Sequence, residues 1–297
     1  MHVFVTGATG WVGSHTVDAL LAAGHTVTGL ARSDASAAAL AAKGVAVQRG
    51  SLEDLASLTA GAQAADAVIH TAFNHDFSKF ADNAAAEMTA IDALGDALAG
   101  TNKVFIVTSG IGMIAPGIKI TEDTQRDPNL PFPRNPEAAA AKVAARGVRV
   151  SLVRLPPSVH GTGDHGFVPI IIGIDKQHGK SAYIGEGANR WPGVHVRDAA
   201  RLYVLALEKG ADNAVYHAVD EQDGVSFREI AEIIGRQLNM PVTSVAADDA
   251  ASHFDWFTNF ALMDAPASSA KTRTSLGWTP REVGLAADLD SAAYFPK

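Results

Sequence analysis

The 297-residue sequence contains no cysteine, which excludes disulfide bonds, thiolate metal sites and a cysteine nucleophile. It contains no apolar run long enough to span a bilayer, and its N-terminus lacks the basic and apolar regions of a signal peptide. The net charge is −8, and the sequence contains no block of Lys or Arg. A nucleic acid or an anionic membrane is therefore not expected as a partner. We expect a cytoplasmic globular protein that binds no metal ion.

Apolar residues make up 47% of the sequence, which is enough for one large or two modest domains. Short β-branched runs alternate with Ala-rich helical stretches over the first two thirds of the chain. The expected strands cover residues 3–6, 25–30, 45–48, 67–70, 104–108 and 148–154. The expected helices cover residues 11–23, 35–43, 52–58, 82–98 and 137–145. This pattern is typical of an α/β fold with a doubly wound parallel sheet of the Rossmann type.

The alternation is interrupted twice. Residues 110–136 are rich in Pro and Gly and are expected to form a long loop. After residue 157 the pattern weakens, and it returns only within residues 194–219. The remaining C-terminal residues, 226–297, are expected to be mainly helical. We therefore expect a small C-terminal cap beside the sheet.

Three glycines follow the first expected strand at fixed spacing, in the segment Thr6-Gly7-Ala8-Thr9-Gly10-Trp11-Val12-Gly13. Glycines at a strand-to-helix turn let the backbone approach a pyrophosphate, whose charge is stabilised by free N–H groups and the helix dipole. The position directly after an N-terminal strand favours this interpretation over a mere tight turn. The expected cofactor contacts in this turn are Gly7, Thr9, Gly10, Trp11, Val12 and Gly13.

With this turn the sequence resembles the extended short-chain dehydrogenase/reductase family, whose fingerprint is T-G-x-x-G-x-x-G. The segments 68–72, 104–110, 154–161 and 191–200 resemble further family motifs and occur in the family's order. The resemblance implies a Rossmann domain that binds NAD(P), with a substrate-binding cap. The NAD(P)-binding domain would comprise residues 1–165 and 194–219, and the cap residues 166–193 and 220–297. Further cofactor contacts are then expected from Ser51, Leu52, Thr71 and Ala72.

The sequence departs from the family at the catalytic pair. The family's acid is a Tyr in Y-x-x-x-K on the helix after the fifth strand, and this sequence has tyrosines only at 183, 203, 216 and 294. If Glu137 matches the acidic residue that follows the family motif, Asn129 and Pro133 stand at the Tyr and Lys places. The sequence is therefore identified as an atypical member, to which the family's mechanism does not transfer.

Arg32 follows the second expected strand, 19 residues after Gly13. An acidic residue near this position would bind the adenosine ribose of NAD, whereas an Arg suits the additional phosphate of NADP. Asp34 could serve the ribose instead, or it could cap the following helix, as could Ser33. We expect NADP(H) to be preferred over NAD(H), with Arg32 as the phosphate ligand.

Without the Tyr–Lys pair, a proton donor must come from the loops at the strand ends. Ser109 leaves the fifth strand where the family places its substrate hydrogen bond, so we expect it to orient the substrate. His75 follows the fourth strand, and His160 stands where the family has a Tyr. Histidine titrates near neutral pH and can donate a proton directly. We favour His160 slightly over His75.

Other features leave alternatives open. Arg190 either contacts a substrate phosphate or pairs with a carboxylate of the cap. The aromatic residues Phe254, Trp256, Phe257 and Phe260 either line a pocket or pack along a helix face. In the family, the equivalents of helices 82–98 and 137–145 build a dimer, so a homodimer is expected.

The functional hypothesis is an NADP-dependent oxidoreductase of the short-chain dehydrogenase/reductase type that acts on a small carbonyl or alcohol substrate. One alternative is a nucleotide-sugar epimerase or dehydratase, because the family performs both reactions. Another is a non-catalytic NADP-binding sensor, which the missing Tyr and Lys favour. The resemblance of residues 154–161 to the family motif and the substantial cap favour an enzyme.

Overall fold

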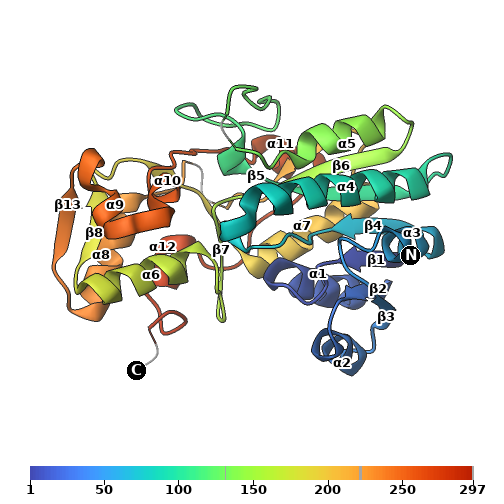
Figure 1. Cartoon of the computed structure of the whole chain (residues 1–297), viewed down its shortest axis with the longest axis horizontal. Helices are drawn as coiled ribbons and strands as arrows, with labels where there is room; N and C mark the ends of the chain where they lie inside the picture. Colours follow the sequence, from blue (N-terminus) through green and yellow to red (C-terminus); the bar gives the residue numbers. More distant parts are fainter. Residues whose placement is uncertain (131, 221–222, 296–297) are drawn as a thin grey trace.

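The computed structural model describes residues 1–130, 132–220 and 223–295 (Figure 1). Its centre is a seven-stranded sheet in the order β11-β6-β5-β4-β1-β2-β3, in which every neighbouring pair is parallel. The strands are β1 (His2–Thr6), β2 (Thr26–Ala31), β3 (Ala46–Arg49), β4 (Ala67–His70), β5 (Val104–Gly110), β6 (Arg149–Leu155) and β11 (Val215–His217). The strand order reverses beside β1, which confirms the expected doubly wound Rossmann sheet.

Helices cover both faces of this sheet (Figure 1). One face carries α1 (Trp11–Ala22), α2 (Asp34–Ala42) and α7 (Val196–Lys209). The other carries α3 (Leu55–Ala64), α4 (Phe80–Leu98) and α5 (Pro136–Ala144). Val3 and Val5 pack into the first layer and Phe4 into the second, and all three are fully buried. The strands are apolar at successive positions because both faces of the sheet are covered.

A third apolar cluster lies outside the sheet and draws on residues between 167 and 191 and between 225 and 295. Its elements are α6 (Phe167–His178), β8 (Ser181–Ile184), α8 (Phe227–Leu238), β13 (Val242–Val245), α9 (Ala251–Phe254), α10 (Thr258–Ala261) and α12 (Leu285–Leu289). Figure 1 shows this cap at the left, beside the carboxyl ends of the central strands. The elements described within residues 226–295 are mainly helical, as expected, and the exception is the short strand β13, which pairs in parallel with β8.

Several short elements join the cap to the sheet domain. They are β7 (Ser158–His160), β9 (Arg190–Trp191), β10 (Gly193–His195), β12 (Val225–Ser226) and α11 (Ala270–Leu276). Strand β10 pairs with β7, and β12 pairs with β9. The buried Asp198 of α7 accepts the backbone N–H groups of Arg281 and Glu282, each at 2.9 Å. This carboxylate therefore anchors the segment that leads into α12.

Helix boundaries differ from the expected ones where a polar side chain caps the helix. Helix α3 begins at Leu55 rather than at residue 52, because Asp54 accepts the backbone N–H of Ser57 at 3.2 Å. Helix α5 begins at Pro136, and Asn135 caps it by accepting the N–H of Ala138 at 3.2 Å. Proline is tolerated at the first helical position because the N–H it lacks would have no partner within the helix.

Candidate cofactor-binding and active site

The turn between β1 and α1 brings the fingerprint glycines into very close contact. Gly7 has a φ of +69°, and its carbonyl accepts the N–H of Gly10 at 2.8 Å. A Cβ on Gly13 would lie 2.0 Å from the Gly7 oxygen, so only glycine allows α1 to start here. Gly10 caps α1 without a side-chain bond, and the first turn of the helix carries no acidic residue. The open, positively polarised end of α1 therefore fits a phosphate group.

A cleft of about 320 Å³ extends from this turn across the carboxyl ends of β1 to β4. The expected residues that line it are Gly7, Thr9, Arg32, Ser51, Leu52, Ala72 and His75. The other lining residues were not expected from the sequence and are Leu30, Ser36, Gly50, Glu53, Phe73 and Asn74. Ligands of open α/β sheets collect at this position, where the strand order reverses. The lining therefore fits a dinucleotide cofactor.

The remaining expected cofactor residues support the turn and do not line this cleft. Thr71 donates its hydroxyl to the carbonyl of Thr6 at 2.8 Å. The Trp11 indole donates to the carbonyl of Val159 at 2.7 Å, which ties α1 to β7. Val12 packs against the apolar cluster on the α1 face of the sheet.

After β2, the structure distinguishes the polar residues around Arg32. Ser33 caps α2 by accepting the N–H of Ser36 at 3.1 Å, so the cap is Ser33 rather than Asp34. The fully exposed Asp34 carboxylate pairs with Arg49 at 2.7 Å. Arg32 itself is exposed and lines the cleft. Arg49 could have been noticed in the sequence, because it ends β3 just before the expected contact Ser51.

After β4, His75 lines the cleft and lies between two phenylalanines. The ring centroids of Phe73 and Phe77 are 5.2 Å and 6.1 Å from that of His75. Desolvation and the positive charge of Arg134 hold the pKa of His75 below its usual 6.5. Arg134 stacks over Phe73 at 4.3 Å and donates through Nε to Glu87 at 2.7 Å. Arg134 was not expected at the site, although it directly follows Pro133 at the family's Lys place.

Ser109 lies in a buried ion network beside the sheet end. Its hydroxyl donates to Glu137 at 2.8 Å, and the same carboxylate accepts two N–H groups of Arg154 at 2.8 Å. Arg154 also lies 3.2 Å from the ring of His217, whose pKa burial lowers to about 4. The Ser109 hydroxyl therefore already has an acceptor within the protein.

The structure places His160 away from the cleft lining. Its ring is fully buried, and its Nδ1 lies 2.8 Å from the Asp288 carboxylate of α12. The ring of His195 lies against it, with a centroid distance of 5.5 Å. His160 thus connects β7 to the cap, and His195 caps α7 by accepting the N–H of Arg197 at 3.2 Å.

Neither residue at the places of the family's Tyr and Lys lies in a helix here. Asn129 and Pro133 both precede α5, which begins at Pro136. The hydroxyl of Tyr203, in α7, lies 2.7 Å from that of Thr108, near the end of β5. Burial raises the pKa of Tyr203, so this phenol is a poor substitute for an acidic tyrosine.

These features define a dinucleotide-binding Rossmann protein with a cap. The family model for the NAD-dependent epimerase/dehydratase family matches residues 3–219. The chain therefore belongs to this family of extended short-chain dehydrogenases/reductases, whose members are NAD-dependent enzymes that bind NAD(H) or NADP(H).

Two relatives are similar to the chain over nearly its whole length. An uncharacterized protein of Schizosaccharomyces pombe is 46% identical over 99% of this chain and 100% of its own. One of Saccharomyces cerevisiae is 44% identical over 97% of this chain and 98% of its own. The structure of a dTDP-glucose 4,6-dehydratase from Streptomyces venezuelae with NAD bound is 22% identical, with a TM-score of 0.77. It covers 99% of this chain and 96% of that chain, and supports the same fold.

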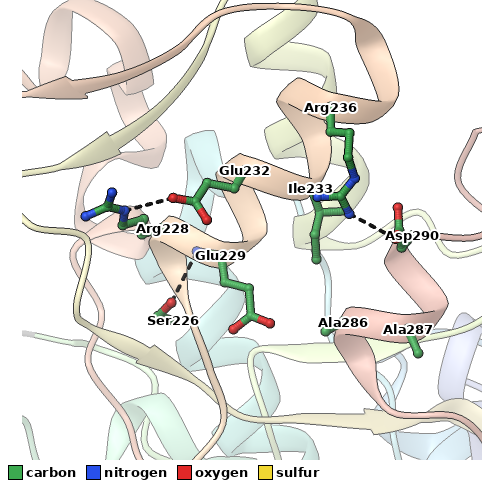
Figure 2. Close-up of a pocket in the computed structure, with 9 residues that line it drawn as sticks. All are labelled: Ser226, Arg228, Glu229, Glu232, Ile233, Arg236, Ala286, Ala287 and Asp290. Atoms are coloured by element: carbon green, nitrogen blue, oxygen red, sulfur yellow. Dashed lines mark hydrogen bonds and ion pairs between the residues drawn. The ribbon is translucent and has the colours of Figure 1, made fainter.

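A second hollow, of about 640 Å³, lies on the cap between α8 and α12 (Figure 2). Its charged side chains are largely paired with one another: Arg228 with Glu232, and Arg236 with Asp290, each at 2.9 Å. The described residues include no group of acidic or histidine side chains arranged to hold a metal ion. Within the same residues, no helix is long and apolar enough to cross a membrane.

The contact between Gly13 and Gly7 leads to a first prediction. Gly13→Ala should lower the affinity for NADPH at least tenfold and destabilise the fold by about 1–3 kcal/mol, because the added methyl group forces the turn apart. Calorimetric titration and thermal unfolding measure the two effects. Gly24→Ala is the matched control: its φ of +82° makes it strained, but no atom lies near its Cβ. Unchanged NADPH affinity in Gly13→Ala would contradict the role of this turn in cofactor binding.

Proposed function

We propose that the protein is an NADP(H)-dependent oxidoreductase that acts on a small carbonyl or alcohol substrate. The observation that carries the proposal is a single cleft that contains the glycine turn, Arg32 and His75. In this arrangement the two ends of a dinucleotide would meet a cationic side chain at one end and a titratable side chain at the other. When bound, the nicotinamide supplies or accepts the hydride.

The cofactor-binding residues follow from the cleft. The free N–H groups at the start of α1 would hold the pyrophosphate, and Leu30 and Leu52 give the adenine an apolar surface. Arg32 would bind the 2′-phosphate of NADP through its guanidinium group, with the nearby Ser36 hydroxyl as a second donor. An acidic side chain at the position of Arg32 would repel this phosphate.

We assign the proton transfer to His75. It lines the cleft, whereas His160 is buried against Asp288 and Ser109 donates to Glu137. Because its pKa is lowered, His75 is mostly neutral at pH 7 and can accept a proton from an alcohol. In the reverse direction, its protonated form donates to the carbonyl oxygen as negative charge develops there.

Two alternative functions can be distinguished from this proposal by experiment. A nucleotide-sugar epimerase or dehydratase needs cations for the diphosphate, and Arg190, the candidate from the sequence, is exposed and donates to the carbonyl of Gly224 at 3.3 Å. A non-catalytic NADP sensor is favoured by the occupied Ser109 hydroxyl. A screen of carbonyl compounds that follows NADPH absorbance separates the functions, because only the oxidoreductase gives net oxidation of NADPH.

We further propose that α4 and α5 form the interface of a homodimer. The outer faces of these helices expose small side chains, among them Ala81, Ala85, Ala138 and Ala141. Small side chains permit close approach of helices, and the two faces would form a four-helix bundle with their symmetry copies.

The second prediction concerns the choice of cofactor. NADPH should bind more tightly than NADH, and Arg32→Ala should lower the affinity for NADPH about ten- to 150-fold with little effect on NADH, because an Arg–phosphate pair contributes about 1.5–3 kcal/mol. Calorimetric titration with both cofactors measures this. Arg49→Ala removes a cation that does not line the cleft, so it should lower the affinity for NADPH less than Arg32→Ala does. Equal affinities of the wild type for NADPH and NADH would reject Arg32 as the phosphate ligand and favour Asp34 as the ribose ligand.

The third prediction concerns His75 and pH. Alcohol oxidation should rise with pH through a pKa below 6.5 and then level off, because it needs neutral His75. Carbonyl reduction should fall with pH through the same pKa, because it needs the protonated ring. His75→Ala should remove this inflection and lower turnover at least tenfold, within the about 10²–10⁴-fold range of general acid–base catalysis.

The control for this prediction is His160→Ala. It should lower thermal stability, because a buried carboxylate loses its partner, and it should change the turnover of the folded protein less than tenfold. A larger turnover loss in His160→Ala than in His75→Ala would reverse the assignment. If neither variant loses tenfold, water supplies the proton.

The fourth prediction concerns assembly. Light scattering at micromolar concentration should give twice the chain mass of 30.9 kDa for the wild type. Ala85→Arg on the outer face of α4 should give the mass of one chain, because the long charged side chain blocks close helix contact. Ala41→Arg on the exposed side of α2 should leave the dimer intact. A monomeric wild type would refute the interface.

A further inference from the structure

A series of aromatic rings in contact runs from the cofactor cleft to the cap. They come from the segment after β4, from the start of α6 and from the helical turns around α10. The rings are Phe73, Phe77, Phe80, Phe167, Trp256 and Phe260. The rings of Phe77 and Trp256 stack with centroids 5.2 Å apart and planes 28° apart. This stacked pair joins the sheet domain to the cap, and we call the six rings the aromatic row.

The aromatic row begins inside the cofactor cleft. Phe73 lines the cleft together with His75, and their ring centroids are 5.2 Å apart. The next ring, Phe77, is 6.1 Å from His75 and contacts Phe260 at 5.6 Å. A molecule that lies along the row is therefore placed beside the group to which we assign proton transfer.

The outer end of the row is not part of the cap core. Trp256 is 48% exposed, whereas its neighbours Phe254 and Phe257 are fully buried and pack with Trp191 in the cap. The core is therefore filled without the Trp256 ring. An exposed indole offers a flat apolar surface on which another aromatic ring stacks favourably.

The guanidinium group that contacts the row already has a partner. Arg134 stacks over Phe73 at 4.3 Å and donates to Glu87 at 2.7 Å. Binding a diphosphate at Arg134 would require this bond to be exchanged, since phosphates are held by charge-assisted hydrogen bonds. A ligand without charge leaves the pair undisturbed.

We propose that the aromatic row binds a flat, uncharged aromatic carbonyl compound, or the corresponding alcohol. The ring of the ligand lies against Phe77 and Trp256, and its oxygen points toward His75. The assignment of this ligand as a substrate rests on the proposed oxidoreductase function, whereas its binding to the row does not.

The binding test uses benzyl alcohol and cyclohexylmethanol, which have equally many carbon atoms but differ in flatness. NMR titrations are carried out on the full chain, both without cofactor and with NADPH, with which an alcohol does not react. Benzyl alcohol should bind about three- to tenfold more tightly. Trp256→Phe should keep this preference and Trp256→Ala should abolish it. Val283→Ala, which removes part of an exposed apolar side chain outside the row, should have no effect.

The kinetic test compares benzaldehyde with cyclohexanecarbaldehyde. The ratio of their kcat/KM values with NADPH should fall about three- to tenfold in Trp256→Ala relative to the wild type, while NADPH affinity stays unchanged. Equal binding of the two alcohols to the wild type, or a preference that survives in Trp256→Ala, would overturn the proposal. If benzyl alcohol binds as expected but no carbonyl compound oxidises NADPH, the aromatic site stands and the oxidoreductase function fails.

Discussion

At Gly13 the first turn of α1 approaches the Gly7 carbonyl so closely that a Cβ would lie 2.0 Å from the oxygen. This contact holds the helix end against the tip of β1 and leaves its N–H groups uncapped. Thr71 is fastened to the same turn through the carbonyl of Thr6, so the end of β4 is positioned with it. The cleft therefore depends on a backbone contact that no larger residue permits, and Arg32 and His75 both line it.

The position of the cap depends on buried polar contacts between the cap and the sheet domain as well as on the cap's own apolar cluster. His160 meets Asp288, and Asp198 holds the backbone of Arg281 and Glu282. A buried charge that loses its partner is costly, so these contacts fix the orientation of α12. Because the boundary between the cap and the sheet domain is fixed in this way, the aromatic rings from the cap and from the segment after β4 can meet in one row.

The departure from the family pattern has a structural counterpart. The family's Tyr and Lys belong on a helix, but the prolines ahead of α5 remove N–H donors and delay the start of that helix to Pro136. Glu137 in its first turn then neutralises Arg154 and accepts the Ser109 hydroxyl. The polar groups at the end of β5 are thus satisfied within the protein, which supports an assignment of proton transfer to the neighbouring loop after β4.

The sequence by itself determined the Rossmann sheet, the glycine turn and the position of Arg32, because these rest on local patterns of apolar periodicity and turn-forming residues. Only the tertiary structure decided which histidine lies in the cleft. His160 and its partner Asp288 are 128 residues apart in the chain, so its burial could not be read from its own segment. The stacking of Phe77 on Trp256 likewise joins distant segments. Such contacts depend on how the cap packs against the sheet domain, which local sequence patterns do not specify.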